Sequence, residues 1–294
     1  MIQGFMLLEM IFSNICYNCK ELRIKGQPAI NNIQKIIEKC DRYLAITGNY
    51  WMAFLKNSPF WHWEPKIIHV DLAVNRADFP FIKENFNQVK KRRFLYIGHT
   101  GWYKNITYLE KLAQKLPETE FAWMGGNQTL KNITTLGKYD FSSQEAKSLI
   151  QEYDFMITLG SADANPTTIL EAMAWGLIPV CSVQSGYAGF SSIRNISIDS
   201  INDSLETIKQ LQSVPDEQLK KWQKGNLTEL DKHFNWDRFC DQVLYEIENE
   251  KSPNLNETNL KQRLELFFAE FRSPMFWGRP DNFYKFLKAN FKYT

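Results

Sequence analysis

The sequence predicts an α/β fold of parallel strands and connecting helices. Apolar runs of strand length alternate with helical patterns from about residue 33 to 250. One sharply delimited helix, about residues 166–175, lies between two short apolar runs at 153–160 and 177–183, which is the order of a βαβ unit. The length of 294 residues, 44% of them hydrophobic, is enough for two domains with sizeable cores.

The first part of the chain is short for a domain. It reads as a helix at "IQKIIEKC", a strand at 42–48, a helix at "NYWMAFLKN" and a strand at 66–74. A free-standing domain commonly has about 100–150 residues. We therefore expect residues 1–80 to form a partial, incomplete N-terminal Rossmann-like domain, followed by a polar linker at 81–93.

Residues 94–250 predict a second, compact Rossmann-like domain. Strands are expected at 94–98, 120–124, 132–136, 153–160, 177–183 and 195–198. Helices are expected at 105–115, 143–152, 166–175, 203–212, 216–233 and 236–249. Ser142 and Glu145 have the spacing of a capping box for the helix at 143–152.

The helix at 166–175 has strong boundary signals and two nearby carboxylates. Asn165 is a favoured N-cap, Pro166 suits the first helical position and Gly176 suits the residue past the end. The loop before it follows the carboxyl end of a strand, where ligands bind in open parallel sheets. The unpaired N–H groups of Thr167 and Thr168 and the helix dipole favour an anion there, beside Asp163 and Glu171. The alternative is an ordinary, well-capped helix with no ligand.

Composition argues against several function classes. A net charge of +2 with scattered basic residues, and no recognisable nucleic-acid-binding motif, argues against nucleic acid as a partner. The five cysteines include one Cys16/Cys19 pair without a second pair to complete a zinc site, so reduced thiols are expected. The apolar opening segment is interrupted by Gln3 and Glu9 and lacks a basic start, so we expect a cytoplasmic protein.

Three segments together resemble a known family. They are "FLYIGHTGWYKN", "FAWMGG" and "YDFMITLGSADANPTTILEAMAWGLIPVCS", in this order along the chain. They are similar to the nucleotide-sugar domain of the group 1, or family 4, retaining GT-B glycosyltransferases. The resemblance covers residues 94 to about 248, and residues 33–80 resemble only the later half of the family's acceptor-side domain.

The resemblance implies roles for individual residues. Glu171 would accept hydrogen bonds from the ribose hydroxyls, and Asp163, in place of the more usual Glu, would contact the transferred sugar near the reacting carbon. Lys104 would pair with the diphosphate. Gly98 would allow the backbone to approach the donor. The segment Asn165-Pro166-Thr167 would lie at the donor site, and the amides of Thr167 and Thr168 would point at the phosphates. Asp163, Lys104 and Glu171 are thus the expected catalytic residues.

His99 departs from the family pattern, in which an arginine usually follows this first glycine. Histidine side chains carry charge only below about pH 6.5, unlike arginine. Either His99 is a plain loop residue, or it contacts the diphosphate. In the second case donor affinity should fall as the pH rises from about 6 to 8.

The family reaction is sugar transfer from a nucleotide-sugar donor with retention of the anomeric configuration. The resemblance implies no protein nucleophile, and the absence of a D-x-D triplet predicts a site without metal. The nucleotide-sugar would be a co-substrate, with no other cofactor, and the acceptor would be a sugar, lipid or protein. Alternatives are a degenerate protein that binds nucleotide-sugar without turnover, because its N-terminal domain is truncated, and a scaffold that binds neither.

The C-terminal tail, residues 251–294, is rich in aromatic residues, with ten of them between 260 and 294. Eight Lys/Arg against four Asp/Glu give this tail a net charge of +4. Packing on the protein's own apolar surface is one expectation. Peripheral contact with a membrane is the alternative.

Overall fold

The computed structural model describes residues 36–248, apart from residues 38, 57–60, 80–81, 142 and 162. The predictions for the opening segment, for Cys16 and Cys19 and for the tail at 251–294 lie outside this range. The described residues fall into two compact units. The larger contains residues 44–52 and 69–248, and the smaller contains residues 36–43 and 53–68.

The first described elements are short. They are β1 (Tyr43–Ala45), α3 (Gly48–Lys56), the 3-10 helix η1 (Trp61–Lys66) and β2 (Ile67–His69), and β1 pairs with β2 in a two-stranded sheet. The predicted strands and helix are confirmed in kind, but β2 is shorter than the predicted 66–74. The N–H of Val70 still donates to the carbonyl of Ala45 (3.0 Å), and that of Asp71 donates instead to Gln242 Oε1 (3.2 Å).

A six-stranded parallel sheet forms the centre of the larger unit. Its strands are β3 (Phe94–Ile97), β4 (Phe121–Met124), β5 (Thr134–Gly137), β6 (Phe155–Thr158), β7 (Ile178–Ser182) and β8 (Arg194–Ile196). Their spatial order is β5-β4-β3-β6-β7-β8, and every neighbouring pair is parallel. This is the doubly wound order in which the chain reverses direction between the first strand, β3, and the fourth, β6. The α/β prediction is therefore confirmed.

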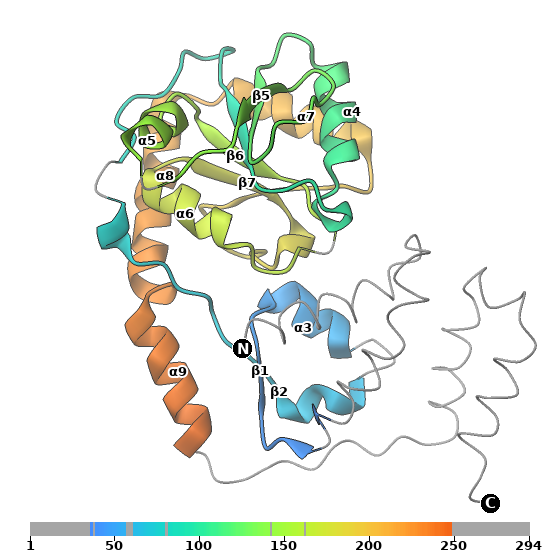
Figure 1. Cartoon of the computed structure of the whole chain (residues 1–294), viewed down its shortest axis with the longest axis vertical. Coiled ribbons are helices and arrows are strands. Elements are labelled where there is room, and N and C mark those ends of the chain that lie inside the picture. Colours follow the sequence, from blue (N-terminus) through green and yellow to red (C-terminus); the bar gives the residue numbers. More distant parts are fainter. Residues whose placement is uncertain are drawn as a thin grey trace, which may run out of the picture. The chain divides into compact units, whose positions relative to one another are not determined.

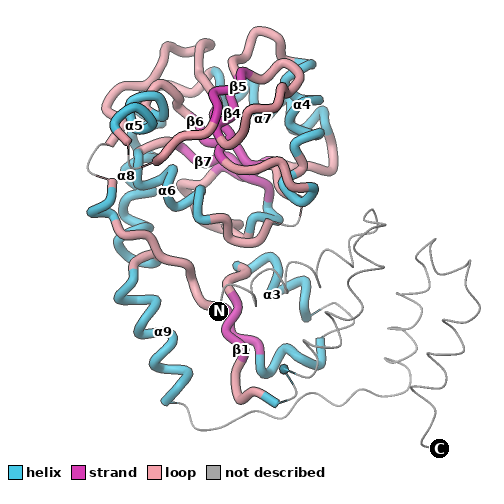
Figure 2. Tube along the Cα trace, viewed as in Figure 1, coloured by secondary structure: helices cyan, strands magenta, loops and turns pink. Residues whose placement is uncertain are grey.

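Helices cover both faces of this sheet (Figures 1 and 2). They are α4 (Ile106–Lys115), α5 (Gln144–Ile150), α6 (Thr167–Trp175), α7 (Ile201–Gln212) and α8 (Asp216–His233). A further helix, α9 (Trp236–Glu248), follows α8 and has no buried residue. Side chains alternate along β3. Phe94 and Tyr96 belong to a core cluster with residues of α4 and α7, whereas Leu95 and Ile97 belong to a second cluster with residues of α6. Both faces of each central strand are thus buried, as expected for parallel strands.

Two predicted helix starts are displaced by one residue. Ser143, not Ser142, is the N-cap of α5, and its hydroxyl accepts from the N–H of Ala146 (3.2 Å). Pro166, not Asn165, is the N-cap residue of α6, because Asn165 adopts a left-handed conformation (φ 46°) one residue earlier. Gly176 ends α6 with φ 83°, as predicted.

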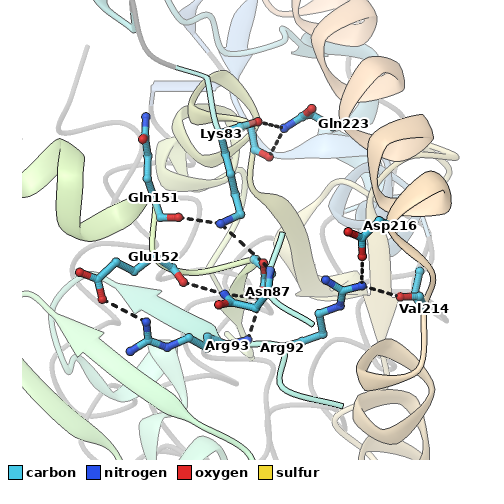
Figure 3. Close-up of polar contacts among 11 residues, drawn as sticks. Lys83, Asn87, Arg92, Arg93, Gln151, Glu152, Val214, Asp216 and Gln223 are labelled. Carbon is cyan, nitrogen blue, oxygen red and sulfur yellow. Dashed lines mark hydrogen bonds and ion pairs between the residues drawn. The ribbon is translucent and has the colours of Figure 1, made fainter. Parts of the chain in front are cut away.

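The segment before β3 is irregular, as predicted for a linker, yet it is tightly held (Figure 3). The buried carboxylate of Asp154, directly before β6, accepts from the backbone N–H of Asn87 (2.8 Å) and Arg93 (3.0 Å) and from the Asn87 side chain (2.9 Å). The buried ammonium of Lys83 lies 3.6 Å from Asp154 Oδ1 and donates to the carbonyl of Gln151 (2.6 Å). This network lies at the amino end of β6, the opposite end from the predicted site.

Candidate functional site

Two loops meet at the point where the order of the strands in the sheet reverses, between β3 and β6. One follows β3 and contains Gly98, His99 and Lys104, and the other follows β6 and contains Asp163 and Asn165. Because β3 and β6 are adjacent and parallel, both loops leave the sheet at its carboxyl edge. In doubly wound sheets this reversal point is the usual place for a ligand. The predicted residues from distant parts of the sequence therefore come together here.

An ion pair joins the two loops. Lys104 Nζ donates to Asp163 Oδ2 at 2.6 Å, and the two side chains are only 13% and 5% exposed. Burial raises the pKa of the Asp163 carboxyl, and the Lys104 ammonium opposes that shift. Lys104 also lies over the ring of Tyr103, 5.3 Å from its centroid. Both residues were predicted, but their mutual contact was not.

The amino end of α6, which follows the Asp163 loop, presents free backbone donors. Pro166 caps the helix without a side-chain hydrogen bond, and the first amide bonded to the cap residue is that of Ile169, at 3.1 Å from Pro166 O. Neither the N–H of Thr167 nor that of Thr168 has a partner among the described residues. Such amides, together with the helix dipole, attract anions.

Glu171 lies one turn further along α6, on the side of Thr167 and Thr168. Its side chain forms no hydrogen bond or ion pair with the described residues, and burial raises the pKa of its carboxyl. Burial also raises the pKa of the Tyr187 phenol, with contributions from the carboxyls of Asp163 and Glu171. Tyr187 donates to the carbonyl of Pro166 (3.3 Å), so it lies beneath the start of α6. Glu171 is thus a partly buried acceptor without a donor in the part of the chain that the structure describes.

Asn165 faces the protein interior. It is 2% exposed, and its N–H donates to the carbonyl of Ser185 (2.9 Å). Its Oδ1 has no hydrogen-bond partner among the described residues. A Cβ added to Gly186 would lie 2.3 Å from that oxygen, and one added to Gly48 would lie 2.7 Å from it. The Asn165 side chain therefore fills the narrow space beside these two glycines.

Gly98 and His99 form a tightly braced turn. Gly98 has φ 141°, and its carbonyl accepts from Trp123 Nε1 (2.7 Å). The His99 carbonyl accepts from the Tyr96 hydroxyl (2.6 Å). The exposed His99 ring contacts the backbone N–H of Gly101 through Nδ1 (3.0 Å) and the Tyr103 hydroxyl through Nε2 (2.9 Å). Both ring nitrogens are thus engaged within the loop.

His69 is held by hydrogen bonds at the start of α3. Its Nδ1 accepts from the N–H of Gly48 (3.1 Å), and its Nε2 lies 3.0 Å from Asp71 Oδ1. The hydrogen bond from His69 and the nearby Arg238 oppose the effect of burial on Asp71, and the pKa of Asp71 is lowered. The contacts assign His69 a capping role.

Sequence reasoning missed Tyr103, Tyr187 and the turn at 183–186. Tyr103 directly precedes the predicted Lys104, and this proximity was the one signal that could have found it. Tyr187 and Gly186 lie beyond β7 and approach the site only through the fold, so no local pattern marks them.

Other features of the described residues do not point to a second centre. They contain no group of His, Cys, Asp or Glu side chains arranged to hold a metal ion. None of their helices is both long enough and apolar enough to cross a bilayer. An open groove between α4 and α7 contains none of the predicted site residues; it is lined by Tyr108, Lys111, Gln114, Lys115, Asp199 and Ile201.

No protein-family model and no curated protein matches the chain. Solved structures do. The chain is 14% identical to sucrose-phosphate synthase from Thermosynechococcus elongatus, over 79% of this chain and 64% of that one, with a TM-score of 0.62. It is 14% identical to a mutant of S. aureus TarM in complex with UDP, over 74% of this chain and 47% of that one, with a TM-score of 0.56.

A third match is the lipopolysaccharide outer core galactosyltransferase WaaB, 15% identical over 72% of this chain and 63% of that one, with a TM-score of 0.53. The chain spans less than two thirds of each of these three proteins. At such identities the likeness shows the fold. The chain has the GT-B-like α/β fold of glycosyltransferases.

Proposed function

We propose that this protein binds a nucleotide-sugar at the junction of β3 and β6 and transfers its sugar to an acceptor with retention of configuration, as group 1 GT-B enzymes do. The observation that carries the proposal is the Lys104–Asp163 ion pair (2.6 Å), which brings a lysine to the loop that leads into the free amides of α6. A diphosphate needs this combination of a cation and backbone donors. The likeness to glycosyltransferase structures, one of them with UDP, supports it.

Each predicted residue has a chemical task in this proposal. Lys104 and the N–H groups of Thr167 and Thr168 bind the diphosphate and stabilise the charge that grows on it. Glu171 accepts hydrogen bonds from the two ribose hydroxyls, and Asp163 accepts from a hydroxyl of the sugar. Asn165 supports the loop from within, and Gly98 keeps the turn after β3 close to the donor. The site works without a metal ion.

The reaction breaks the bond between the anomeric carbon and the phosphate oxygen. A new bond forms on the same face between that carbon and an acceptor oxygen, and the acceptor proton passes to the departing phosphate oxygen. Lys104 lowers the energy of the leaving diphosphate, and no protein side chain becomes covalently attached. The products are a nucleoside diphosphate and a glycoside. We place this activity in the cytoplasm.

Incubation with a panel of nucleotide-sugars tests the proposal. Release of nucleoside diphosphate and the anomeric proton coupling of the product are measured together. Lys104→Ala and Glu171→Ala should abolish release, whereas Lys111→Ala, an exposed lysine in the groove on α4, should not. Binding of a donor without turnover would favour the degenerate binding protein. If the protein binds none of the donors, the proposed function is contradicted.

A further inference from the structure

The loop after β3 contains a chain of contacts that leads from His99 to Lys104. Gly101 N–H and the Tyr103 hydroxyl contact the two nitrogens of the His99 ring at 3.0 and 2.9 Å. The Tyr103 ring lies below the Lys104 ammonium, and the Tyr103 carbonyl accepts from the N–H of Ser161 (2.9 Å) in the neighbouring loop. Tyr103 therefore contacts both His99 and Lys104.

The contacts of the ring define its protonation. A backbone N–H can only donate, so His99 Nδ1 must accept from Gly101 and carries no proton. The ring proton then lies on Nε2 and is donated to the Tyr103 oxygen. A doubly protonated ring would place an N–H against the Gly101 N–H, two donors facing each other. The arrangement requires neutral imidazole.

The position of Gly101 depends on the same ring. A Cβ added to Gly101 would lie 2.7 Å from His99 Cε1, so the imidazole packs directly on this glycine. The backbone on either side of the ring is fixed as well, since the Gly98 and His99 carbonyls accept from the buried Trp123 and Tyr96. The His99 ring therefore packs and hydrogen-bonds within its own loop and acts as a brace between Gly101 and Tyr103.

We propose that His99 is a positioning residue for donor binding: as neutral imidazole protonated on Nε2, it holds Tyr103 beneath Lys104 and makes no charged contact with the diphosphate. This inference rests on the proposed function. It predicts that donor affinity falls as His99 becomes protonated, which is the opposite pH dependence from that of a histidine ligand to phosphate. The other ionisable groups around His99 are Tyr96 from β3, Tyr103 and Lys104 from the 3-10 helix η3 (Trp102–Lys104), and Asp163 from the loop after β6.

Two readouts on the full chain test this inference. Imidazole ¹⁵N chemical shifts should show His99 neutral and protonated on Nε2 at about pH 7.5, with its signal assigned by comparison with His99→Asn. Isothermal titration calorimetry with UDP, GDP and ADP should show that Tyr103→Phe weakens binding of the preferred diphosphate by about 3- to 10-fold, the effect of one hydrogen bond. Tyr108→Phe is the matched control, because its hydroxyl bonds Ser204 Oγ (2.8 Å) away from this loop.

The pH series distinguishes a positioning role of His99 from a direct contact between His99 and the phosphates. Between about pH 5.5 and 8, wild-type affinity should rise with pH relative to His99→Asn, which retains an acceptor for the Gly101 N–H. An Nδ1-protonated or charged ring at pH 7.5, an unchanged affinity in Tyr103→Phe, or an affinity that falls with pH relative to His99→Asn would each overturn the inference. Wild-type protein that binds none of the three diphosphates at any pH would overturn the proposed function itself, and the ¹⁵N shifts would still report whether the brace exists.

Discussion

The ion pair of Lys104 and Asp163 links the stability of the fold to the proposed binding of a diphosphate. With Lys104 removed, the Asp163 carboxylate is buried without its cation. We predict that Lys104→Ala lowers the free energy of unfolding by about 1–3 kcal/mol at pH 7 and abolishes diphosphate binding. Urea unfolding and calorimetry measure the two effects.

The pH dependence of this variant has a definite sign. Loss of Lys104 removes the group that opposes the raised pKa of Asp163, so the native state then binds a proton more readily. The stability deficit of Lys104→Ala should therefore shrink as the pH falls and Asp163 becomes protonated. The double variant Lys104→Ala/Asp163→Asn should regain stability at pH 7 without regaining binding. A deficit that grows in acid would contradict the paired arrangement.

Glu171 should show a conflict between stability and function. Burial raises the pKa of its carboxyl, so the folded state loses stability as the pH rises above about 4.5, where the unfolded carboxyl ionises. Glu171→Gln should raise the free energy of unfolding at pH 7 by roughly 0.5 kcal/mol, and this gain should vanish near pH 3. The same variant should lose donor binding, because an amide replaces the double acceptor. A less stable Glu171→Gln would argue against this account.

At the scale of elements, the local sequence signals predicted whether a segment is a helix or a strand better than they predicted where it begins and ends. The strands β3, β6 and β7 were predictable because strands buried on both faces appear as continuous apolar runs. The N-caps of α5 and α6 were displaced by one residue, since adjacent residues offer similar caps, as Ser142 and Ser143 do. The Lys104–Asp163 contact joins residues 59 positions apart, and no local pattern specifies it.

The predicted linker is anchored by a single carboxylate. Asp154 accepts three hydrogen bonds from residues 87 and 93 and faces the buried Lys83. Asp154→Ala should therefore lower the free energy of unfolding by about 3–5 kcal/mol, because Lys83 is left without its counter-charge. Asp241→Ala, exposed on α9, is the control and should change it by less than about 0.5 kcal/mol. Equal stability of both variants would contradict the anchoring role.

At the scale of the whole molecule, a bound donor should stabilise the unit that contains the six-stranded sheet. A ligand at 100 times its dissociation constant adds about 2.7 kcal/mol to the native state. A thermal scan with a nucleoside diphosphate at that ratio should raise the melting temperature by about 5–10 °C, and Lys104→Ala should show no shift. A shift of equal size in the variant would place the ligand at another site.

The strand order itself explains why the predicted residues converge. The order β5-β4-β3-β6-β7-β8 places the loop after β3 beside the loop after β6. Sequence alone predicted the parallel units, but this adjacency is a property of the completed sheet. The resemblance of residues 94–248 to a known family supplied the expected roles, and the fold places Lys104, Asp163 and the start of α6 at the carboxyl end of the sheet.

A crystal structure of the full chain with a bound nucleoside diphosphate tests the central claim most directly. We predict that the phosphates contact the N–H groups of Thr167 and Thr168 and the ammonium of Lys104, with the ribose hydroxyls on the carboxylate of Glu171. Phosphates bound away from the start of α6, with Lys104 still paired only with Asp163, would contradict the account.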